Sequence, residues 1–316
     1  MNEHLKIVFM GTPDFAVTIL DSLLKAKHTI TGVITAPDKP AGRGRKLNQS
    51  AVKKYALEQD LNILQPTNLK SEEFIEELSE LEANLFIIVA FRMLPKVVWG
   101  MPKFGTFNLH ASLLPNYRGA APINWAIING EKTTGVTTFF IDEKIDTGEI
   151  ILNKSCSIEE DESAGELHDK LMHLGSKLVL ETVALIQEGD VKTKKQEDVE
   201  DIKTAYKIHR DTCKINWDND IDTIYNHIRG LSPYPSAWTT LQNGEEEYEL
   251  KIFKANKELA SHESIPGTLV YNKKTLKIAV SGGYLVIQEV KLQGKRKIAV
   301  VDFLNGFNFE LDAKVC

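Results

Sequence analysis

Cysteine is scarce in this sequence of 316 residues: Cys156, Cys213 and Cys316 are the only three, and their spacing matches neither a disulfide framework nor a zinc site. Long apolar runs are missing too, and the apolar stretch near the N-terminus is too short for a secretion signal. The formal net charge is −6, which argues against a uniformly basic nucleic-acid-binding surface. We therefore expect a cytoplasmic protein with reduced thiols, no metal and no membrane partner.

Hydrophobic residues make up 42% of the sequence and are spread along its whole length, enough for a sizeable core in each of two domains. The first half opens with a β-type run at 6–10, an amphipathic helical pattern at 14–26 and a second β-type run at 29–35. The apolar string NLFIIVAF at 84–91 is typical of a strand buried on both faces. This alternation predicts an α/β fold with a doubly wound, Rossmann-like parallel sheet.

The character of the chain changes after a long amphipathic helical pattern at 166–187. The next stretch, 190–205, is densely charged and has no apolar period, so we expect a linker there. From 206 to 316, short alternating β runs separated by NG, NK and SGG turn signals predict a small OB-like β-barrel. The expected organisation is therefore a sheet domain at 1–189, a charged linker at 190–205 and a barrel domain at 206–316.

Three polar residues lie at expected strand ends, where α/β sheets bind their ligands. Asn108 and His110 are two apart in the strand-like FNLHASLLP, so they share one face, and Asp146 follows the strand-like VTTFFID. Singly, each is also explained as a locally hydrogen-bonded or turn residue. Together they suit acyl transfer to an amine: an amide and an imidazolium stabilise the developing oxyanion, and a carboxylate handles the proton.

The residues around this triplet also match a known family. The string NLHASLLPNYRGAAPINWAIINGE, followed by TGVTTFFIDEKIDTGEI, closely resembles the folate-dependent formyltransferases, whose catalytic signature is Asn-x-His with a later Asp-Thr-Gly. The resemblance implies catalytic roles for Asn108, His110 and Asp146, and 10-formyltetrahydrofolate as co-substrate. It further implies a tetrahydrofolate-binding stretch just after the strand, namely Ser112, Leu113, Leu114 and Pro115.

The same resemblance places the pteridine ring in an apolar crevice between the loops AFRMLP and IDEK. The candidates on these loops are Arg92, Met93, Leu94, Ile141, Asp142 and Glu143. Ordinary loop packing is the alternative for Met93, Leu94 and Ile141. The sequence has Ala90-Phe91-Arg92 where many members of the transfer-RNA branch have a glycine-containing Ala-Tyr-Gly version, and the arginine resembles the glycinamide ribonucleotide relatives instead. This departure concerns the loop geometry and leaves the reaction unchanged.

The family formylates the α-amine of methionyl-tRNA, the amine of glycinamide ribonucleotide or amines of nucleotide-linked sugars, and the catalytic triplet does not choose among them. The glycine-rich basic segment 36–56 looks like the loop with which the transfer-RNA branch enters the acceptor end. By that match Arg43 is the main RNA contact, flanked by Arg45 and Lys46. A solvated basic loop is the alternative. Since the segment KINWDNDIDTIYNHIRGLSPYPSAWTTL also resembles that branch, we expect aminoacylated initiator tRNA as the acceptor.

A second basic cluster, KLQGKRK, carries Lys295, Arg296 and Lys297. These side chains either contact tRNA phosphates or belong to an exposed β-turn. Two rival functions remain open: a nucleotide-sugar N-formyltransferase, and a non-catalytic RNA-binding protein that has kept the fold. No coiled-coil pattern or long exposed apolar helix indicates assembly, so we expect a monomer.

Overall fold

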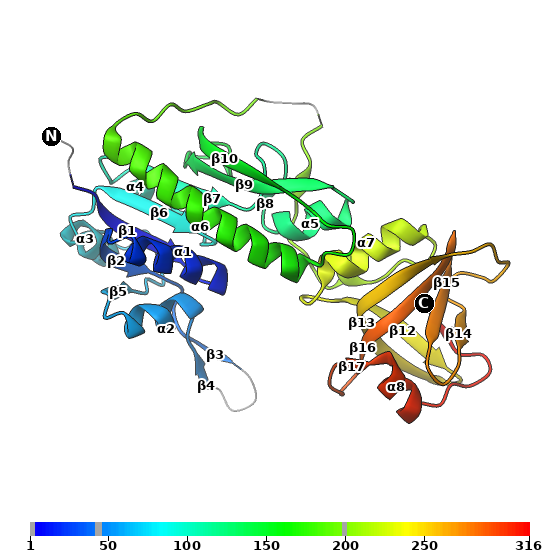
Figure 1. Cartoon of the computed structure of the whole chain (residues 1–316). Coiled ribbons are helices and arrows are strands. Elements are labelled where there is room, and N and C mark those ends of the chain that lie inside the picture. Colours follow the sequence, from blue (N-terminus) through cyan, green and yellow to red (C-terminus); the bar gives the residue numbers. More distant parts are fainter. Residues whose placement is uncertain (1–3, 42–45, 198–200) are drawn as a thin grey trace. The chain divides into compact units, whose positions relative to one another are not determined.

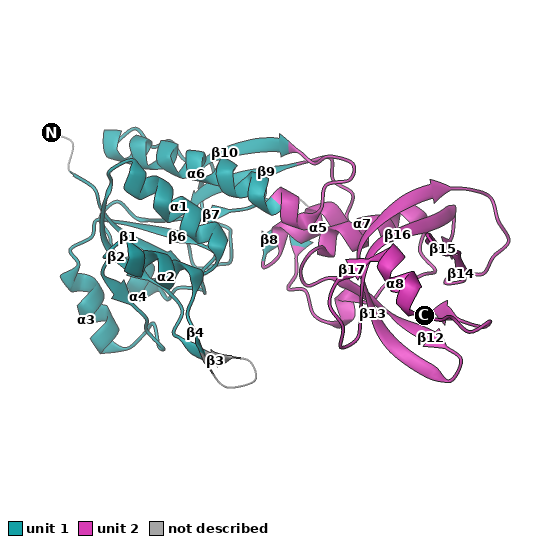
Figure 2. Ribbon diagram, turned by 60° about the horizontal axis from the view of Figure 1, so that its bottom comes forward, with its two compact units in different colours: residues 1–119, 134–156, 168–204 teal, residues 120–133, 157–167, 205–316 magenta. Residues whose placement is uncertain are grey.

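The computed structural model describes residues 4–41, 46–197 and 201–316 (Figure 1). The chain forms two compact units (Figure 2). Unit 1 contains residues 1–119, 134–156 and 168–204, and unit 2 contains residues 120–133, 157–167 and 205–316. The chain therefore crosses between the units several times. The expected domain ranges stay a prediction.

Unit 1 is built on a seven-stranded sheet with the order β10-β9-β7-β6-β1-β2-β5. Its strands are β1 (Lys6–Gly11), β2 (Thr29–Ile34), β5 (Ile63–Leu64), β6 (Leu85–Val89), β7 (Thr106–His110), β9 (Thr133–Phe140) and β10 (Ile150–Ser157). The five strands from β7 to β5 are parallel, whereas β9 is antiparallel to β7. The Rossmann-like sheet is confirmed, with a mixed edge. Side-chain alternation is the same for both strand directions, so the sequence pattern could not reveal the reversal of β9.

Helices cover both faces of this sheet. They are α1 (Asp14–Lys25), α2 (Ala51–Glu58), α3 (Glu72–Glu80), α4 (Lys96–Trp99) and α6 (Ala164–Glu188), of which the part from residue 168 belongs to unit 1. Figure 1 shows α1 and α6 side by side, and Thr18 Oγ1 of α1 donates to Met172 Sδ of α6 at 3.0 Å. On the opposite face, Phe74 and Leu78 of α3 pack against Ile88 and other buried residues of β1 and β6.

The register of the sheet decides which face carries the polar residues of β7. Asn108 pairs with Ile88, which belongs to the core under α3. Paired residues on neighbouring strands point to the same face, and residues two apart along a strand do so as well. Leu109 points the other way, since it contacts Gly175 of α6 closely enough that a Cβ there would lie 2.7 Å from its side chain. Asn108 and His110 therefore belong to the α3 face.

A short antiparallel hairpin extends from unit 1, formed by β3 (Lys39–Ala41) and β4 (Lys46–Asn48). The residues that connect these strands, 42–45, lie outside the described part of the chain. Two further two-residue strands are β8 (Arg118–Gly119) and β11 (Thr204–Ala205).

Unit 2 contains an antiparallel sheet with the order β14-β15-β16-β13-β12-β18, and β17 pairs with β16. Its strands are β12 (Ala237–Asn243), β13 (Glu246–Leu259), β14 (Leu269–Tyr271), β15 (Leu276–Val280), β16 (Gly283–Leu292), β17 (Ile298–Ala299) and β18 (Lys314–Val315). A bridge between Thr268 and Lys314 joins the two ends of the sheet, so it nearly closes. The expected β-barrel is confirmed.

The helices of unit 2 pack against this barrel and against each other. They are α5 (Pro122–Ile128), α7 (Ile221–Leu231) and α8 (Val300–Gly306), with a 3-10 turn η1 (Asp211–Cys213). Asp220 caps α7, because its Oδ1 accepts from Thr223 N at 2.9 Å. Gly230 of α7 allows a close approach of α5: a Cβ there would lie 2.7 Å from Ile128. None of the described helices is long and apolar enough to cross a membrane.

Candidate active site

His110 ends β7 and is 6% exposed. Its Nε2 lies 2.7 Å from Tyr117 O, and its Nδ1 lies 3.7 Å from Asp146 Oδ2. A carbonyl oxygen only accepts hydrogen bonds, so Nε2 must carry the hydrogen in this contact. Nδ1 is then the nitrogen that remains for the carboxylate and for a reacting group.

Asp146 lies in the loop at 141–149, between β9 and β10. Its φ of 55° is left-handed, a conformation that costs about 1–2 kcal/mol for most non-glycine residues but that Asp tolerates better. Its Oδ2 accepts from Gly119 N at 2.9 Å. A residue other than glycine does not fit at position 148, because a Cβ would lie 1.6 Å from Phe140 O. The glycine of Asp-Thr-Gly is thus required because the loop passes very close to the end of β9 at this position.

Asn108 lies on the same face of β7 as His110, between Ile88 of β6 and Phe139 of β9. The residue is half-buried, and no hydrogen bond joins its side-chain amide to another described residue. Polar side chains in such places normally have a partner. The amide is therefore available to a ligand, and its N–H suits a carbonyl oxygen.

The stretch expected to bind tetrahydrofolate directly follows β7. Ser112 is fully buried, and its Oγ donates to Asn116 O at 2.7 Å. Leu114 is 6% exposed, and its N–H donates to Thr137 Oγ1 at 3.3 Å. Both side chains are occupied by internal packing, whereas Leu113 and Pro115 are half-buried. A ligand contact by any of the four stays a prediction.

The two loops expected to hold the pteridine ring come together in the structure. Leu94 is buried in the core under α3, and Ile141 packs against the same core. Lys96 Nζ lies 2.8 Å from Glu143 Oε1, which ties the loops at the surface and lowers the pKa of Glu143 through this hydrogen bond. Met93 is 65% exposed. Leu94 and Ile141 thus belong to the sheet face that carries Asn108 and His110.

Arg92, where the sequence departs from the transfer-RNA branch, fixes its own loop. Its Nη1 donates to Thr67 O at 3.1 Å, and its Nη2 donates to Pro66 O. Partial burial lowers the pKa of the guanidinium. The arginine thus joins its loop to the neighbouring 66–67 segment through these hydrogen bonds.

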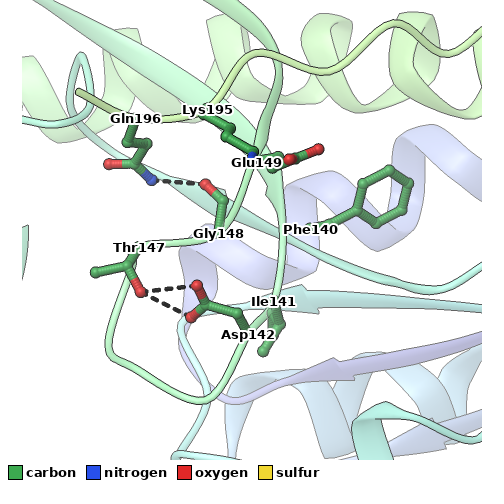
Figure 3. A pocket seen from close by; sticks show the side chains of 8 residues that line it. All are labelled: Phe140, Ile141, Asp142, Thr147, Gly148, Glu149, Lys195 and Gln196. Atoms are coloured by element: carbon green, nitrogen blue, oxygen red, sulfur yellow. Dashed lines mark hydrogen bonds between the residues drawn. The ribbon is translucent and has the colours of Figure 1, made fainter.

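A cavity of about 430 Å³ adjoins the Asp146 loop (Figure 3). Such a volume lies in the usual range of small-molecule sites, about 300–1,000 Å³. Its lining residues are Phe140, Ile141, Asp142, Thr147, Gly148, Glu149, Lys195 and Gln196. Asp142 and Thr147 face each other across the loop, with Thr147 Oγ1 donating to Asp142 Oδ1 at 2.7 Å. Lys195 and Gln196 were not among the predicted site residues, because nothing in a charged, aperiodic stretch distinguishes an anchored segment from a linker.

The expected RNA loop can be followed only at its base. Arg43 and Arg45 lie outside the described residues, and Lys46 begins β4. Just before β3, Asp38 Oδ1 accepts from Gln65 Nε2 at 2.8 Å, and Asp38 Oδ2 lies 2.7 Å from Lys53 Nζ. These hydrogen bonds lower the pKa of Asp38, the one from Gln65 most of all. The hairpin that carries the basic loop is therefore fixed at its base.

The second basic cluster forms an exposed turn after β16, in unit 2, whereas the catalytic candidates belong to unit 1. Lys297 Nζ lies 2.8 Å from Glu289 Oε2 and 5.4 Å from the centre of the Phe253 ring. Part of its charge is thus neutralised within the unit. RNA contact by Lys295, Arg296 and Lys297 stays a prediction. Among the described residues, no three His, Cys, Asp or Glu side chains gather as a metal site would require.

Comparisons with known proteins agree with this geometry. Residues 5–183 match the Formyl transferase family, and residues 207–308 match Formyl transferase, C-terminal domain. Proteins named methionyl-tRNA formyltransferase from Flavobacterium johnsoniae and Flavobacterium psychrophilum are 58% and 59% identical, each over 99% of both chains. A protein of the same name from Bacteroides fragilis is 51% identical over 97% of this chain and 96% of its own.

Two solved structures share the fold. The sugar 3N-formyl transferase WlaRD is 23% identical with a TM-score of 0.63, over 93% of this chain and 100% of its own. HypX from Aquifex aeolicus, in complex with tetrahydrofolic acid, is 18% identical with a TM-score of 0.66, over 99% of this chain and 51% of its own. At these identities the likeness concerns the arrangement of the backbone.

Proposed function

Because the chain belongs to the formyl transferase family, we propose that it transfers the formyl group of 10-formyltetrahydrofolate to the α-amino group of methionyl-tRNA. The full-length relatives at 51–59% identity carry this activity in their name. The main support for this chemistry is the proximity of His110 Nδ1 to Asp146. The Asn108 side-chain amide belongs to the same sheet face as His110 and has no hydrogen bond to another described residue.

The three side chains divide the reaction between them. The Asn108 amide and a charged His110, through Nδ1–H, donate to the formyl oxygen, which gains negative charge as the amine attacks. Asp146 accepts the proton released by the amine, directly or through water. A new C–N bond forms to the methionyl amine, the bond from the formyl carbon to the folate N10 breaks, and the proton ends on N10. No protein nucleophile is needed.

The folate has a suitable place beside these groups. Ile141 lines the cavity next to the Asp146 loop and packs against the same apolar core as Leu94, and such an apolar wall suits a flat heterocycle. Asp142 lies on the same loop as Asp146 and lines the cavity next to it. The residues present therefore fit the co-substrate.

The acceptor is a polyanion, although the protein is acidic overall. The β3–β4 hairpin, anchored by Asp38, carries the local excess of basic residues that phosphate contacts require. We assign Arg43, Arg45 and Lys46 to this contact and initiator tRNA as the natural acceptor. Since aminoacylated tRNA is made and used in the cytoplasm, the enzyme works there, as a single chain.

An acceptor assay tests the proposal. The protein is incubated with 10-formyltetrahydrofolate and, separately, with methionyl-tRNA and with amino-sugar nucleotides, and the amine that gains the formyl group is identified by mass. We expect formyl-methionyl-tRNA alone. Formylation of the sugar nucleotide would replace the assigned acceptor, and binding of the tRNA without transfer to either amine would favour a non-catalytic RNA-binding protein.

A further inference from the structure

The charged segment after α6 contributes a side chain to the active site. Resting on the proposed function, we propose that Gln196 is a positioning residue that holds the Asp146 loop, and with it the Asp146 carboxylate, in place for formyl transfer. Gln196 itself contacts neither the reacting atoms nor His110 in this arrangement. It acts through Asp146.

The Gln196 side chain uses its amide fully. Its Nε2 donates to Gly148 O at 2.8 Å (Figure 3). It also donates to Asp146 O at 2.9 Å. Its Oε1 accepts from Arg118 Nε at 3.0 Å and from Arg118 Nη2 at 2.7 Å. One side chain thus joins the loop that carries Asp146 to the strand β8.

Strand β8 also carries the direct partner of the carboxylate, since Gly119 N donates to Asp146 Oδ2 at 2.9 Å. Its neighbour Tyr117 accepts from His110 Nε2 at 2.7 Å. Gln196 therefore connects the two backbone segments that set the relative position of His110 and Asp146. A change in either segment alters the 3.7 Å spacing between Nδ1 and Oδ2.

The segment that carries Gln196 is itself held against the sheet. Lys194 N donates to Ile150 O, and Ile150 N donates to Lys194 O, both at 2.8 Å. Thr193 Oγ1 donates to Glu149 Oε2. These contacts hold Gln196 in position without a substrate, so its side-chain amide is preorganised.

Asp146 needs such support because of its backbone. Its φ of 55° is left-handed, and a residue in this region persists only where its surroundings enforce the conformation. The two hydrogen bonds from Gln196 go to the carbonyl of this residue and to that of Gly148, two residues further on. Removing them leaves two carbonyl acceptors and the Arg118 fork without partners, and the loop relaxes.

The test uses the full-length enzyme and the variant Gln196→Met, which keeps the side-chain length and removes both donors and the acceptor. We expect kcat for formyl transfer to methionyl-tRNA to fall by about 10- to 100-fold, because small misplacements of catalytic groups have effects of this size. KM for both substrates should change little. Gln187→Ala, an exposed glutamine at the end of α6, is the matched control and should keep the wild-type rate.

A second variant guards against a simple loss of folding. Gln196→Glu keeps an acceptor for Arg118 but has no donor for Asp146 O and Gly148 O, so its kcat should fall at least as far while the melting temperature stays near that of the wild type. Wild-type kcat in either folded variant would overturn the proposal. A rise in KM with unchanged kcat would overturn it as well, since it would indicate a role in binding.

A double-mutant comparison with Asp146 distinguishes a positioning role of Gln196 from an unspecific loss of activity. In an Asp146→Asn background, adding Gln196→Met should lower the single-turnover rate little further, because the two residues act as one unit. Multiplying effects would overturn the proposal. Failure of the proposed function is recognised separately, since the wild-type enzyme itself would then not formylate methionyl-tRNA.

Discussion

At the scale of single residues, His110 presents one ring nitrogen to a substrate rather than two. Nε2 is occupied by Tyr117 O, at 2.7 Å, and Nδ1 lies 3.7 Å from Asp146 Oδ2. The imidazole is thereby held in one orientation before the reaction, with Nε2–H on the carbonyl and Nδ1 on the side of Asp146. Catalysis by such fixed donors depends on where they point, so removal of the ring should affect the transition state much more than substrate binding.

Replacement of His110 by alanine should therefore lower kcat by about 100- to 1,000-fold, the usual cost of losing one oxyanion donor. Steady-state formylation of methionyl-tRNA measures this, and a filter-binding assay should find tRNA affinity near the wild-type value. His173→Ala, at an exposed position on α6, serves as the control. A near-normal turnover of His110→Ala would refute the catalytic assignment.

A second histidine should govern stability instead of activity. His227 lies on α7, its Nε2 is buried without a partner among the described residues, and burial lowers its pKa below the ordinary value near 6.5. The unfolded chain then binds a proton more readily than the folded one. The free energy of unfolding should accordingly be intact above pH 6.5 and fall as the pH drops towards the lower, folded-state pKa, by up to about 1.4 kcal/mol per pH unit.

Denaturant unfolding of the wild type and of His227→Phe between pH 8 and pH 5.5 checks this sign. The wild type should lose stability faster than the variant below pH 6.5. Parallel curves for the two proteins would contradict it.

At the scale of elements, the loop between β9 and β10 is shaped by contacts that leave no room for change. Gly148 lies so close to the end of β9 that a Cβ would meet Phe140 O at 1.6 Å. The loop must return tightly to place Asp146 beside Gly119 and His110. A change that alters the path of this loop therefore also moves Asp146 away from Gly119 and His110.

The variant Gly148→Ala should push the loop outwards and lower kcat by about 100-fold, because a displacement near 1 Å has effects of this order. Formylation kinetics and the melting temperature are measured together. Gly306→Ala, at the end of α8 with nothing within 4 Å of the added Cβ, is the control and should leave both unchanged. An active Gly148→Ala enzyme would mean that the loop tolerates another path.

The elements also explain how far the sequence could predict this protein. Asn108 and His110 were visible because they lie two apart in a strand-like stretch that runs into a loop, so alternation places both side chains on one face. The direction of β9 was not visible, since alternation has no direction. Gln196 was missed because its role depends on the folded positions of Asp146 and Arg118, far away in sequence, and no local pattern encodes them.

At the scale of the whole molecule, an acidic protein is expected to bind a polyanion through a confined basic segment. The net charge of −6 repels RNA at long range, so we expect the affinity to come from a few local cations, with those near the β3–β4 hairpin as the first candidates. Each phosphate contact releases counterions and makes binding sensitive to salt.

The KM for methionyl-tRNA should therefore rise with salt concentration, and Arg43→Ala should raise KM at low salt while reducing the slope of log KM against log salt by about 1. The KM for the folate should be insensitive to this substitution. Lys70→Ala, an exposed lysine outside the hairpin, is the control. An unchanged KM and slope in Arg43→Ala would remove the loop from tRNA binding.

Unit 2 is built from three separate segments of the chain, and this limits which recombined genes encode a protein that folds. Residues 120–133 and 157–167 belong to unit 2, and Arg229 of α7 donates to Glu162 O at 2.8 Å across these segments. A recombination event that replaced only the chain after residue 205 would bring in an α7 shaped for another α5 and another 157–167 segment. We therefore expect homologous exchange between distant lineages to succeed only where all three segments change at once.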